Sequence, residues 1–362
     1  MPPVLASLNA LALSLASRAS CSHAVVTPVC HSQALGPTGG AGFGPGRLSR
    51  RTEGRSRGRS AERLTGATVV FWATFPPDRY SGRRPLTIES GYVNTAYGRF
   101  YFDSVGQGKP VLFIHGGTAS AREWRWVLPA LGEHARCVAI DRLGCGRSDR
   151  SERGYDRATI TSALLACADA LGLERFGVVG QSFGGLWALS LAFTAPERVS
   201  RLVVVDSAVG PRTEEELEQR RAHPPAFQLA KPWYQLSAGE REANLDSVFA
   251  RIFADPSRVD PSFRQDLIWQ NDHADRNQPR LGGELFEGMA RQNYGAIRCP
   301  TLVVWGEADS MDPVGYGQRL AAAIPGARFV GLPGVGHTCQ IEDPVGFVAA
   351  VAPFLDETDA VG

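Results

Sequence analysis

The chain has little of what marks several large classes of protein. Its 362 residues carry 38 basic and 37 acidic side chains, a formal net charge of +1, and only two of the basic residues are lysines. No stretch reaches the roughly 18 to 20 consecutive apolar residues that a membrane-spanning helix requires. The near-zero charge gives no general attraction to nucleic acid or to an anionic membrane. We therefore expect a small molecule as the partner, with no nucleic acid and no membrane involved, and the composition leaves the oligomeric state open.

Cysteine is also sparse and without a recognisable spacing. The seven cysteines include no C-x-x-C pair and no spacing that suits zinc. An odd number of scattered cysteines indicates thiols in a reducing compartment rather than a disulfide framework. We therefore expect a cytoplasmic protein without a metal site.

The chain does contain enough apolar surface for a large core. Hydrophobic residues make up 43% of it and charged residues 21%. This balance excludes a wholly disordered, collagen-like or coiled-coil protein. The length suits two ordinary domains, or one large α/β domain that carries an insertion.

The first 66 residues differ from the rest of the chain. They hold eight arginines against two acidic residues, Glu53 and Glu62, and a glycine-rich run. Such a segment cannot bury enough apolar surface to offset the entropy lost on ordering. We expect residues 1–66 to be a disordered Arg/Gly/Ser-rich extension. It is either a targeting segment, as its many arginines and serines suggest, or a misassigned start of the chain.

Residues 87–210 alternate short apolar strands with helices. Strands are predicted over 101–105, 111–114, 137–140, 177–180 and 202–205, and helices over 157–171 and 185–194. Uniformly apolar strands joined by helices indicate a mostly parallel sheet covered on both faces. In such a sheet ligands bind beyond the carboxyl ends of the strands, so we search there for reactive residues.

Residues 211–298 interrupt this pattern. They contain helical stretches with scattered aromatic residues and no strand of the preceding kind. The sheet pattern returns within residues 299–358, with strands over 301–305 and 327–330 and a helix over 343–355. We expect 211–298 to be a helical insertion whose aromatic residues mainly form its own small core.

Ser182 is the candidate nucleophile. It is the central residue of a G-x-S-x-G sequence, Gly180 to Gly184, between a predicted strand and a predicted helix. A sharp strand-to-helix turn exposes the serine oxygen at the edge of the sheet, and the flanking glycines avoid clashes. The second match, Gly54 to Gly58, lies in the extension without a strand or a helix beside it, and we reject it.

A serine hydroxyl needs an adjacent base, and the base needs an acid that orients it. His337 lies in a glycine-rich loop after the last predicted strand, at the same edge of the sheet, and is the candidate base. Asp309 follows the strand over 301–305 and is the first choice for the acid. Asp312 and Asp206 are alternatives, and Glu307 is the least suitable.

The negative oxygen formed during attack on a carbonyl needs preorganised donors. We expect the backbone N–H of Phe183 to be one, because it follows the nucleophile, and that of Gly117 to be the other. His115 lies beside the second donor and suits fixing this loop better than carrying a proton.

Taken together, these residues resemble the α/β-hydrolase fold family. The resemblance covers roughly residues 90–357 and rests on five motifs in the family's order: His115-Gly116-Gly117, the loop over 141–148, the turn at Ser182, the acid at Asp309 and Gly336-His337. It implies a helical cap over 211–298, no cofactor, and the triad Ser182, Asp309 and His337. Dehalogenase and epoxide-hydrolase relatives use an aspartate where this chain has Ser182, which argues against both, whereas peroxidase-like relatives share the serine triad.

We expect a serine hydrolase that cleaves an ester or related acyl bond of a small hydrophobic molecule through an acyl-enzyme. One alternative is a carbon–carbon bond hydrolase acting on ring-fission diketones. Its substrates carry a carboxylate, for which the insertion offers Arg251, Arg258, Arg264 and Arg291. The other alternative is a ligand-binding receptor that keeps the fold without turnover.

Overall fold

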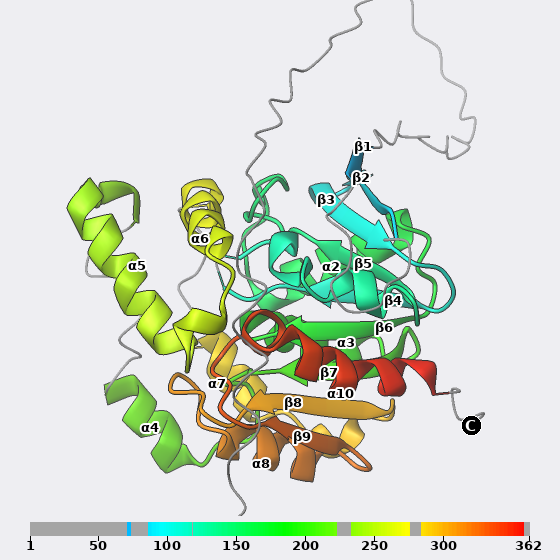
Figure 1. Ribbon diagram of the computed structural model, residues 1–362. Coiled ribbons are helices and arrows are strands. Elements are labelled where there is room, and N and C mark those ends of the chain that lie inside the picture. The colour runs from blue at the N-terminus through cyan, green and yellow to red at the C-terminus, as the bar shows by residue number, and fades with distance from the viewer. Residues whose placement is uncertain (1–70, 74–85, 118, 223–232, 276–283, 358–362) are drawn as a thin grey trace, which may run out of the picture. The chain divides into compact units, whose positions relative to one another are not determined.

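The computed structural model describes residues 71–73, 86–117, 119–222, 233–275 and 284–357 (Figure 1). The extension over residues 1–66, which we expect to be disordered, lies outside the described residues. Within the described part, no helix is both long and apolar enough to cross a membrane.

A nine-stranded sheet forms the centre of the described chain. Its strand order is β1-β2-β3-β5-β4-β6-β7-β8-β9. Antiparallel pairing joins β1 (Phe71–Ala73), β2 (Ile88–Thr95) and β3 (Gly98–Val105), and it also joins β3 to β5. The remaining neighbours are parallel: β5 (Arg136–Ile140), β4 (Pro110–Ile114), β6 (Phe176–Gln181), β7 (Val199–Val205), β8 (Thr301–Gly306) and β9 (Arg328–Leu332). The prediction of a mostly parallel central sheet is confirmed.

The central strands are apolar throughout because both faces of the sheet are covered. In β4, Leu112 and Ile114 join one hydrophobic cluster, and Val111 and Phe113 join the cluster on the opposite face. Successive side chains of a strand point to opposite faces, so a strand buried on both sides has no polar position. Sequence alone therefore located these strands well.

Each face of the sheet has its own helices. The first cluster includes α2 (Arg157–Ala170), α3 (Phe183–Thr194) and α8 (Gly315–Ala323). The second includes η1 (Ala121–Trp124), α1 (Leu128–Leu131), α9 (Cys339–Glu342) and α10 (Pro344–Asp356). The expected arrangement of helices on both faces is thus confirmed, and it leaves the carboxyl edge of the parallel strands for the reactive loops.

The described parts of residues 211–298 are helical and contain no strand. They form α4 (Glu214–Ala222), η2 (Trp233–Gln235), α5 (Ala238–Ile252), η3 (Pro256–Arg258), α6 (Ser262–His273), α7 (Glu284–Ala290) and η4 (Tyr294–Ala296). Figure 1 shows α5 and α6 standing to one side of the sheet. The start of α5 follows from its sequence: the Ser237 hydroxyl accepts from the backbone N–H of Glu240, whose carboxylate accepts from that of Ser237.

Buried aromatic residues in the described part of the insertion pack in two clusters. Phe253 and Phe263 form a small cluster with Val259 and with Ile341 of α9. Phe286 and Met289 of α7 instead belong to the main cluster on the α2 and α3 face of the sheet. The insertion therefore packs in two parts, one over the loops at the sheet edge and one within the main core.

Candidate active site

Ser182 occupies a sharp turn between β6 and α3. Its backbone has φ 50° and ψ −117°, and its N–H donates to the carbonyl of Val205 across 2.8 Å. A positive φ is strained for a residue with a Cβ, so the surrounding contacts must enforce it. A Cβ on Gly180 would overlap the carbonyl of Gly184, and a Cβ on Gly184 would overlap that of Ile114. The two glycines of the motif are thus required by close approach of the backbone.

The structure brings the three predicted side chains together. Nε2 of His337 lies 2.9 Å from Oγ of Ser182, and Nδ1 lies 2.8 Å from Oδ2 of Asp309. Ser182 follows β6, Asp309 follows β8, and His337 lies between β9 and α9. His337 and Asp309 are buried, whereas Ser182 is partly exposed. Ser182 is therefore partly accessible to solvent, while its two partners are shielded from it.

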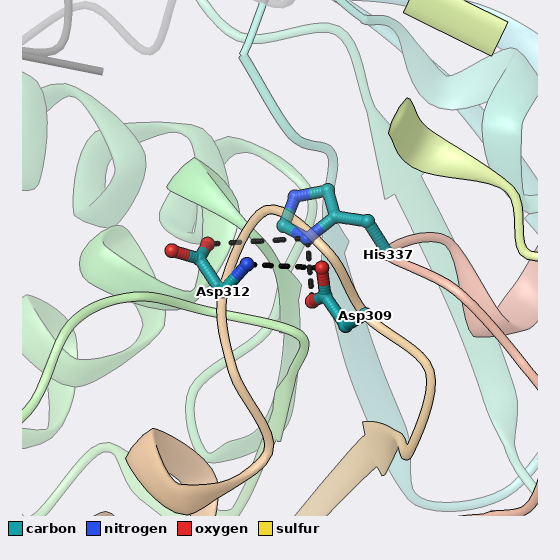
Figure 2. Close-up of side chains that lie close together, drawn as sticks. All are labelled: Asp309, Asp312 and His337. Atoms are coloured by element: carbon teal, nitrogen blue, oxygen red, sulfur yellow. Dashed lines mark hydrogen bonds and ion pairs between the residues drawn. The ribbon is translucent and has the colours of Figure 1, made fainter. Parts of the chain in front are cut away.

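Among the four candidate acids, Asp309 alone makes the short contact to the imidazole. Figure 2 shows Asp309 and Asp312 facing the same ring nitrogen of His337, but the carboxylate of Asp312 is 3.9 Å away. The other oxygen of Asp309 accepts from the backbone N–H groups of Met311 and Asp312, which fixes the carboxylate in its loop. The geometry thus favours the first choice made from the sequence.

The two remaining acids lie elsewhere. Asp206 accepts from the backbone N–H groups of Gly306 and Cys339, at 2.8 and 3.1 Å, so it joins the end of β8 to the segment after His337. Burial and the charge of Asp309 raise the pKa of Asp206. Glu307 is exposed. Neither one orients the imidazole.

The charge environment favours the protonated form of His337. Burial by itself lowers its pKa, but the negative charge of Asp309 and their hydrogen bond, with smaller contributions from Asp312 and Asp206, raise the pKa to about 9. The imidazolium that forms when a serine proton is taken up is therefore stabilised. The imidazole can accept a proton only in its neutral form, so a general-base role is favoured as the pH rises toward this pKa.

The two backbone donors predicted from the sequence are the N–H of the residue after the nucleophile and that of Gly117, in the loop of His115. The N–H groups of Gly117 and Phe183 make no hydrogen bond within the described part of the chain. Phe183 begins α3, where the first N–H groups of a helix have no partner in the helix itself and carry its partial positive charge. An oxyanion donor must have no other partner, so both N–H groups remain the predicted donors for a developing oxyanion.

His115 fixes the loop that carries Gly117. Its Nε2 accepts from the backbone N–H of Arg142 across 3.0 Å, so its Nδ1 carries the proton and donates to the carbonyl of Gly116 at 2.9 Å. Burial and the charge of Arg142 hold the pKa of His115 well below its ordinary value. A neutral ring with both nitrogens engaged fits the loop-fixing role expected from the sequence.

Two further buried side chains, those of Arg142 and Glu123, hold the same loop. Nη2 of Arg142 donates to the carbonyls of Gly116 and Gly117 at 2.8 and 2.5 Å, and the Glu123 carboxylate accepts from the N–H of Gly116 at 3.0 Å. Burial raises the pKa of Glu123 to about 8, although the Gly116 hydrogen bond and Arg142 oppose the shift. Sequence analysis gave neither residue a role. The bonds of Arg142 join the loop after β5 to the loop after β4, and Glu123 lies in a short helix that was not predicted.

Sequence analysis also missed Gln181, the residue just before the nucleophile. Its buried side-chain amide donates to the backbone carbonyl of His337. The G-x-S-x-G pattern allows any residue at this position, so it gave no signal. The only indication in the sequence was a polar residue between the apolar strand positions and the nucleophile.

Asp309, Asp312 and His337 are also the one group of described residues whose ligand atoms lie close enough together to hold a metal ion. Nδ1 of His337 and both oxygens of Asp309 already take part in hydrogen bonds. An ion would have to replace the hydrogen bond between the imidazole and Asp309. The donor set therefore fits an acid–imidazole pair better than a metal centre.

The four arginines that we considered for a substrate carboxylate differ in their surroundings. Arg264 pairs with Glu242 and Asp246, Arg291 with Glu214 and Glu287, and Arg258 with Asp255. Arg251 forms no ion pair with any described residue, and its Nε is buried without a hydrogen bond. Of the four, Arg251 is the one whose charge is not already engaged.

Comparison with known proteins identifies relatives in both sequence and fold. A family model described as alpha/beta hydrolase fold matches residues 109–344. The 2-hydroxymuconate semialdehyde hydrolase of Pseudomonas sp. strain CF600 is 32% identical over 262 residues, which are 70% of this chain and 89% of that protein. A solved N-acyl homoserine lactone degrading enzyme covers 73% of this chain and 99% of its own, with 26% identity and a TM-score of 0.57. A carboxylesterase of Bacillus subtilis shares the fold, with 22% identity and a TM-score of 0.61 over 74% of this chain and 91% of its own. The chain therefore belongs to the α/β-hydrolase fold family.

Proposed function

We propose that the protein is a serine hydrolase that cleaves an ester or related acyl bond of a small hydrophobic molecule through an acyl-enzyme. One observation carries the proposal: Nε2 of His337 lies 2.9 Å from Oγ of Ser182 while Asp309 engages the other ring nitrogen. A binding protein needs no activated serine, so this arrangement supports an enzyme over a receptor.

Each group has a defined role in the proposed reaction. Oγ of Ser182 attacks the carbonyl carbon while His337 takes the hydroxyl proton, and Asp309 stabilises the imidazolium. The N–H groups of Gly117 and Phe183 donate to the oxygen of the tetrahedral intermediate. His337 then protonates the leaving alcohol, which departs from the acyl-enzyme. Water, deprotonated by the same imidazole, releases the acid and restores Ser182, so one ester and one water give one acid and one alcohol.

The domain assignment is part of the proposal. Residues 87–210 and 299–358 form the two parts of the hydrolase core, and 211–298 form a helical cap beside the reactive edge. Two contacts support this assignment: Ile252 at the end of α5 hydrogen-bonds to His337, and Asp255, which follows α5, hydrogen-bonds to Glu342 of α9. A cytoplasmic location, finally, is consistent with the five cysteines of the described residues, none of which forms a disulfide.

Carbon–carbon bond hydrolysis is the second candidate. The Pseudomonas relative is a hydrolase whose named substrate, 2-hydroxymuconate semialdehyde, carries a carboxylate and no ester bond. Arg251, at the end of α5, has a buried Nε without a partner. A guanidinium in this state suits a substrate carboxylate.

Three measurements test the function. A fluorophosphonate probe should label wild-type protein at Ser182 and leave the Ser182→Ala variant unlabelled. The same variant should lose roughly 10⁴- to 10⁶-fold in kcat with its folding unchanged, and retention of a tenth of wild-type turnover would remove Ser182 from its role. Turnover of p-nitrophenyl acetate against that of a coloured ring-fission product then separates the two candidates. Folded wild-type protein that the probe does not label would favour a receptor.

A further inference from the structure

The last carbonyls of α5 are capped by the loops that carry the proposed base and acid. The backbone N–H of His337 donates to the carbonyl of Ile252, the final residue of α5, at 2.7 Å. The hydroxyl of Ser310, next to Asp309, donates to the carbonyl of Arg251 at 2.9 Å. The final carbonyls of a helix have no partner within it. Here the reactive loops supply two of those partners.

A single buried carboxylate strengthens this junction. Glu342 ends α9 and is only 3% exposed. Its Oε2 accepts from the N–H groups of Gly336 and Ala254, at 2.8 and 3.1 Å, and its Oε1 accepts from that of Asp255 at 2.7 Å. Gly336 directly precedes His337, whereas the other two residues follow α5 in the insertion. The carboxylate therefore binds both sides at once.

The backbone at Gly336 also lies against the backbone at the end of α5, so closely that only a glycine fits. A Cβ on Gly336 would lie 2.6 Å from the carbonyl oxygen of Ile252 and 2.7 Å from the nitrogen of Ala254. Real Cβ atoms essentially never approach backbone atoms this closely. Next to Glu342, Ile341 packs with Phe253 and Phe263 of the insertion. The end of α5 thus cannot shift without moving the segment that holds the imidazole.

We propose that Glu342 is a positioning residue that couples the docking of α5 to the placement of the His337 imidazole. The proposal rests on the proposed function, because it takes His337 as the base for Ser182. A displacement of about 1 Å in a reacting group can cost on the order of 10²-fold in rate. A substrate that contacts the insertion would in this way change the position of the His337 imidazole through Glu342, without contacting Glu342 itself.

The first test compares Glu342→Gln with a matched control, Glu307→Gln. The two carboxylate oxygens of Glu342 accept from three backbone N–H groups. Glutamine has only one acceptor oxygen, so at least one of these N–H groups loses its partner. Glu307 is an exposed glutamate in the loop of Asp309. We expect Glu342→Gln to stay folded and to lower both kcat for p-nitrophenyl acetate and the rate of fluorophosphonate labelling about 10- to 100-fold. Its KM should change less than about threefold, since no substrate contact is removed.

The pH profile separates positioning from a purely structural role. A loosened imidazole is held less well by Asp309, so the acid limb of kcat/KM should move to lower pH in Glu342→Gln and stay in place in Glu307→Gln. A folded Glu342→Gln that labels at the wild-type rate with an unchanged profile would overturn the coupling. Failure of the wild-type protein and of Glu307→Gln to label would instead contradict the proposed function.

A second test uses the wild-type protein and does not depend on how the variant folds. Coupling between two sites is reciprocal. A group bound at Ser182 that displaces the His337 imidazole must therefore also change the docking of α5. Covalent modification of Ser182 by the fluorophosphonate should change hydrogen exchange of the amides of Ala254 and Asp255. Exchange in α8, on the other side of the core, serves as the reference. Unchanged exchange at Ala254 and Asp255 after complete labelling would rule the coupling out.

Discussion

The side-chain amide of Gln181 donates to the backbone carbonyl of His337, with 2.7 Å between nitrogen and oxygen. The residue before the nucleophile therefore holds the main chain of the base, while the nucleophile itself contacts the imidazole. A shift in one partner of the Ser182–His337 pair is thus transmitted directly to the other. Like the Glu342 carboxylate, this contact restrains the backbone around His337. Gln181 does so from the end of β6, whereas Glu342 does so from α9.

Replacement of Gln181 by methionine should slow catalysis without unfolding the protein. Methionine has a similar length but no N–H, so the buried carbonyl of His337 loses its donor. A lost hydrogen bond of this kind is worth about 1 kcal/mol, and we expect a roughly fivefold lower kcat for p-nitrophenyl acetate. Gln219→Met, at an exposed position of α4, is the matched control. Equal kcat in the two variants would show that Gln181 does not hold the base.

The activity should follow the raised pKa of His337. A general base must be neutral to take a proton, so below its pKa of about 9 the kcat/KM should fall about tenfold per pH unit. Asp309→Asn removes the largest stabilising charge, so the limb should move down toward the ordinary value near 6.5 and kcat should drop about 10⁴-fold. Both effects can be measured in one series of p-nitrophenyl acetate assays from pH 5 to 10.

Asp312→Asn is the control for that series. Its carboxylate lies 3.9 Å from the imidazole, against 2.8 Å for Asp309. We expect a small downward shift of the limb and a kcat within about threefold of wild type, because the orienting hydrogen bond remains. A larger loss in Asp312→Asn than in Asp309→Asn would reverse the roles of the two acids.

Glu123→Gln should change the pH dependence of stability more than activity. The pKa of Glu123 rises from about 4.5 to about 8 on burial, so the folded protein binds this proton more tightly than the unfolded chain. The contribution to the free energy of unfolding is therefore full below pH 4.5 and is lost as the pH rises through 8. Glutamine has no such proton and still accepts from Gly116. We compare the free energy of unfolding of Glu123→Gln with that of wild type at two pH values. The difference should shift in favour of the variant by about 1 to 3 kcal/mol between pH 4.5 and pH 9.

Urea unfolding at a series of pH values measures this directly. The kcat of Glu123→Gln should stay within about threefold of wild type, since the loop donor Gly117 keeps its support from Arg142. Identical pH slopes for the two proteins would mean that Glu123 has an ordinary pKa in the fold.

Gly184→Ala should be strongly destabilising, whereas Gly288→Ala should not. A Cβ at Gly184 would overlap backbone atoms of Ile114 and His115, which cannot move without opening the sheet. At Gly288, in α7, a Cβ meets nothing within 4 Å. We expect a loss of at least about 3 kcal/mol at the first position and a gain of about 0.5 to 1 kcal/mol at the second. Thermal unfolding of both variants checks the contrast, and a tolerated Gly184→Ala would contradict the close approach at the Ser182 turn.

The sequence located the reactive side chains because parallel strands bring their carboxyl ends to one edge. Ser182, Asp309 and His337 each follow a strand, so their convergence depends on topology alone. Uniformly apolar strands such as β4 were equally clear. In contrast, β2 was not predicted, since polar residues such as Glu89, Ser90 and Asn94 interrupt its apolar pattern near the edge of the sheet.

The residues that support the site had no comparable signal. All of them act through backbone groups, some near in the chain and others far along it: Gln181, Glu123, Arg142 and Glu342. Any peptide group can accept or donate such a bond, so no residue type on the partner side marks the contact. Choosing Asp309 over Asp312 likewise required a distance, because both acids lie in one loop.

The division of the insertion between two clusters has a practical consequence for protein engineering. Met289 of α7 and Tyr294 of η4 are fully enclosed with α3 in the main body of the molecule, whereas α5 and α6 are not. A chimera that transplants the lid of another enzyme onto this scaffold should therefore exchange the chain only up to a junction before Glu284. Chimeras that also replace α7 and η4 would lose Met289 and Tyr294 from the main hydrophobic core. We expect such chimeras to be expressed as insoluble protein.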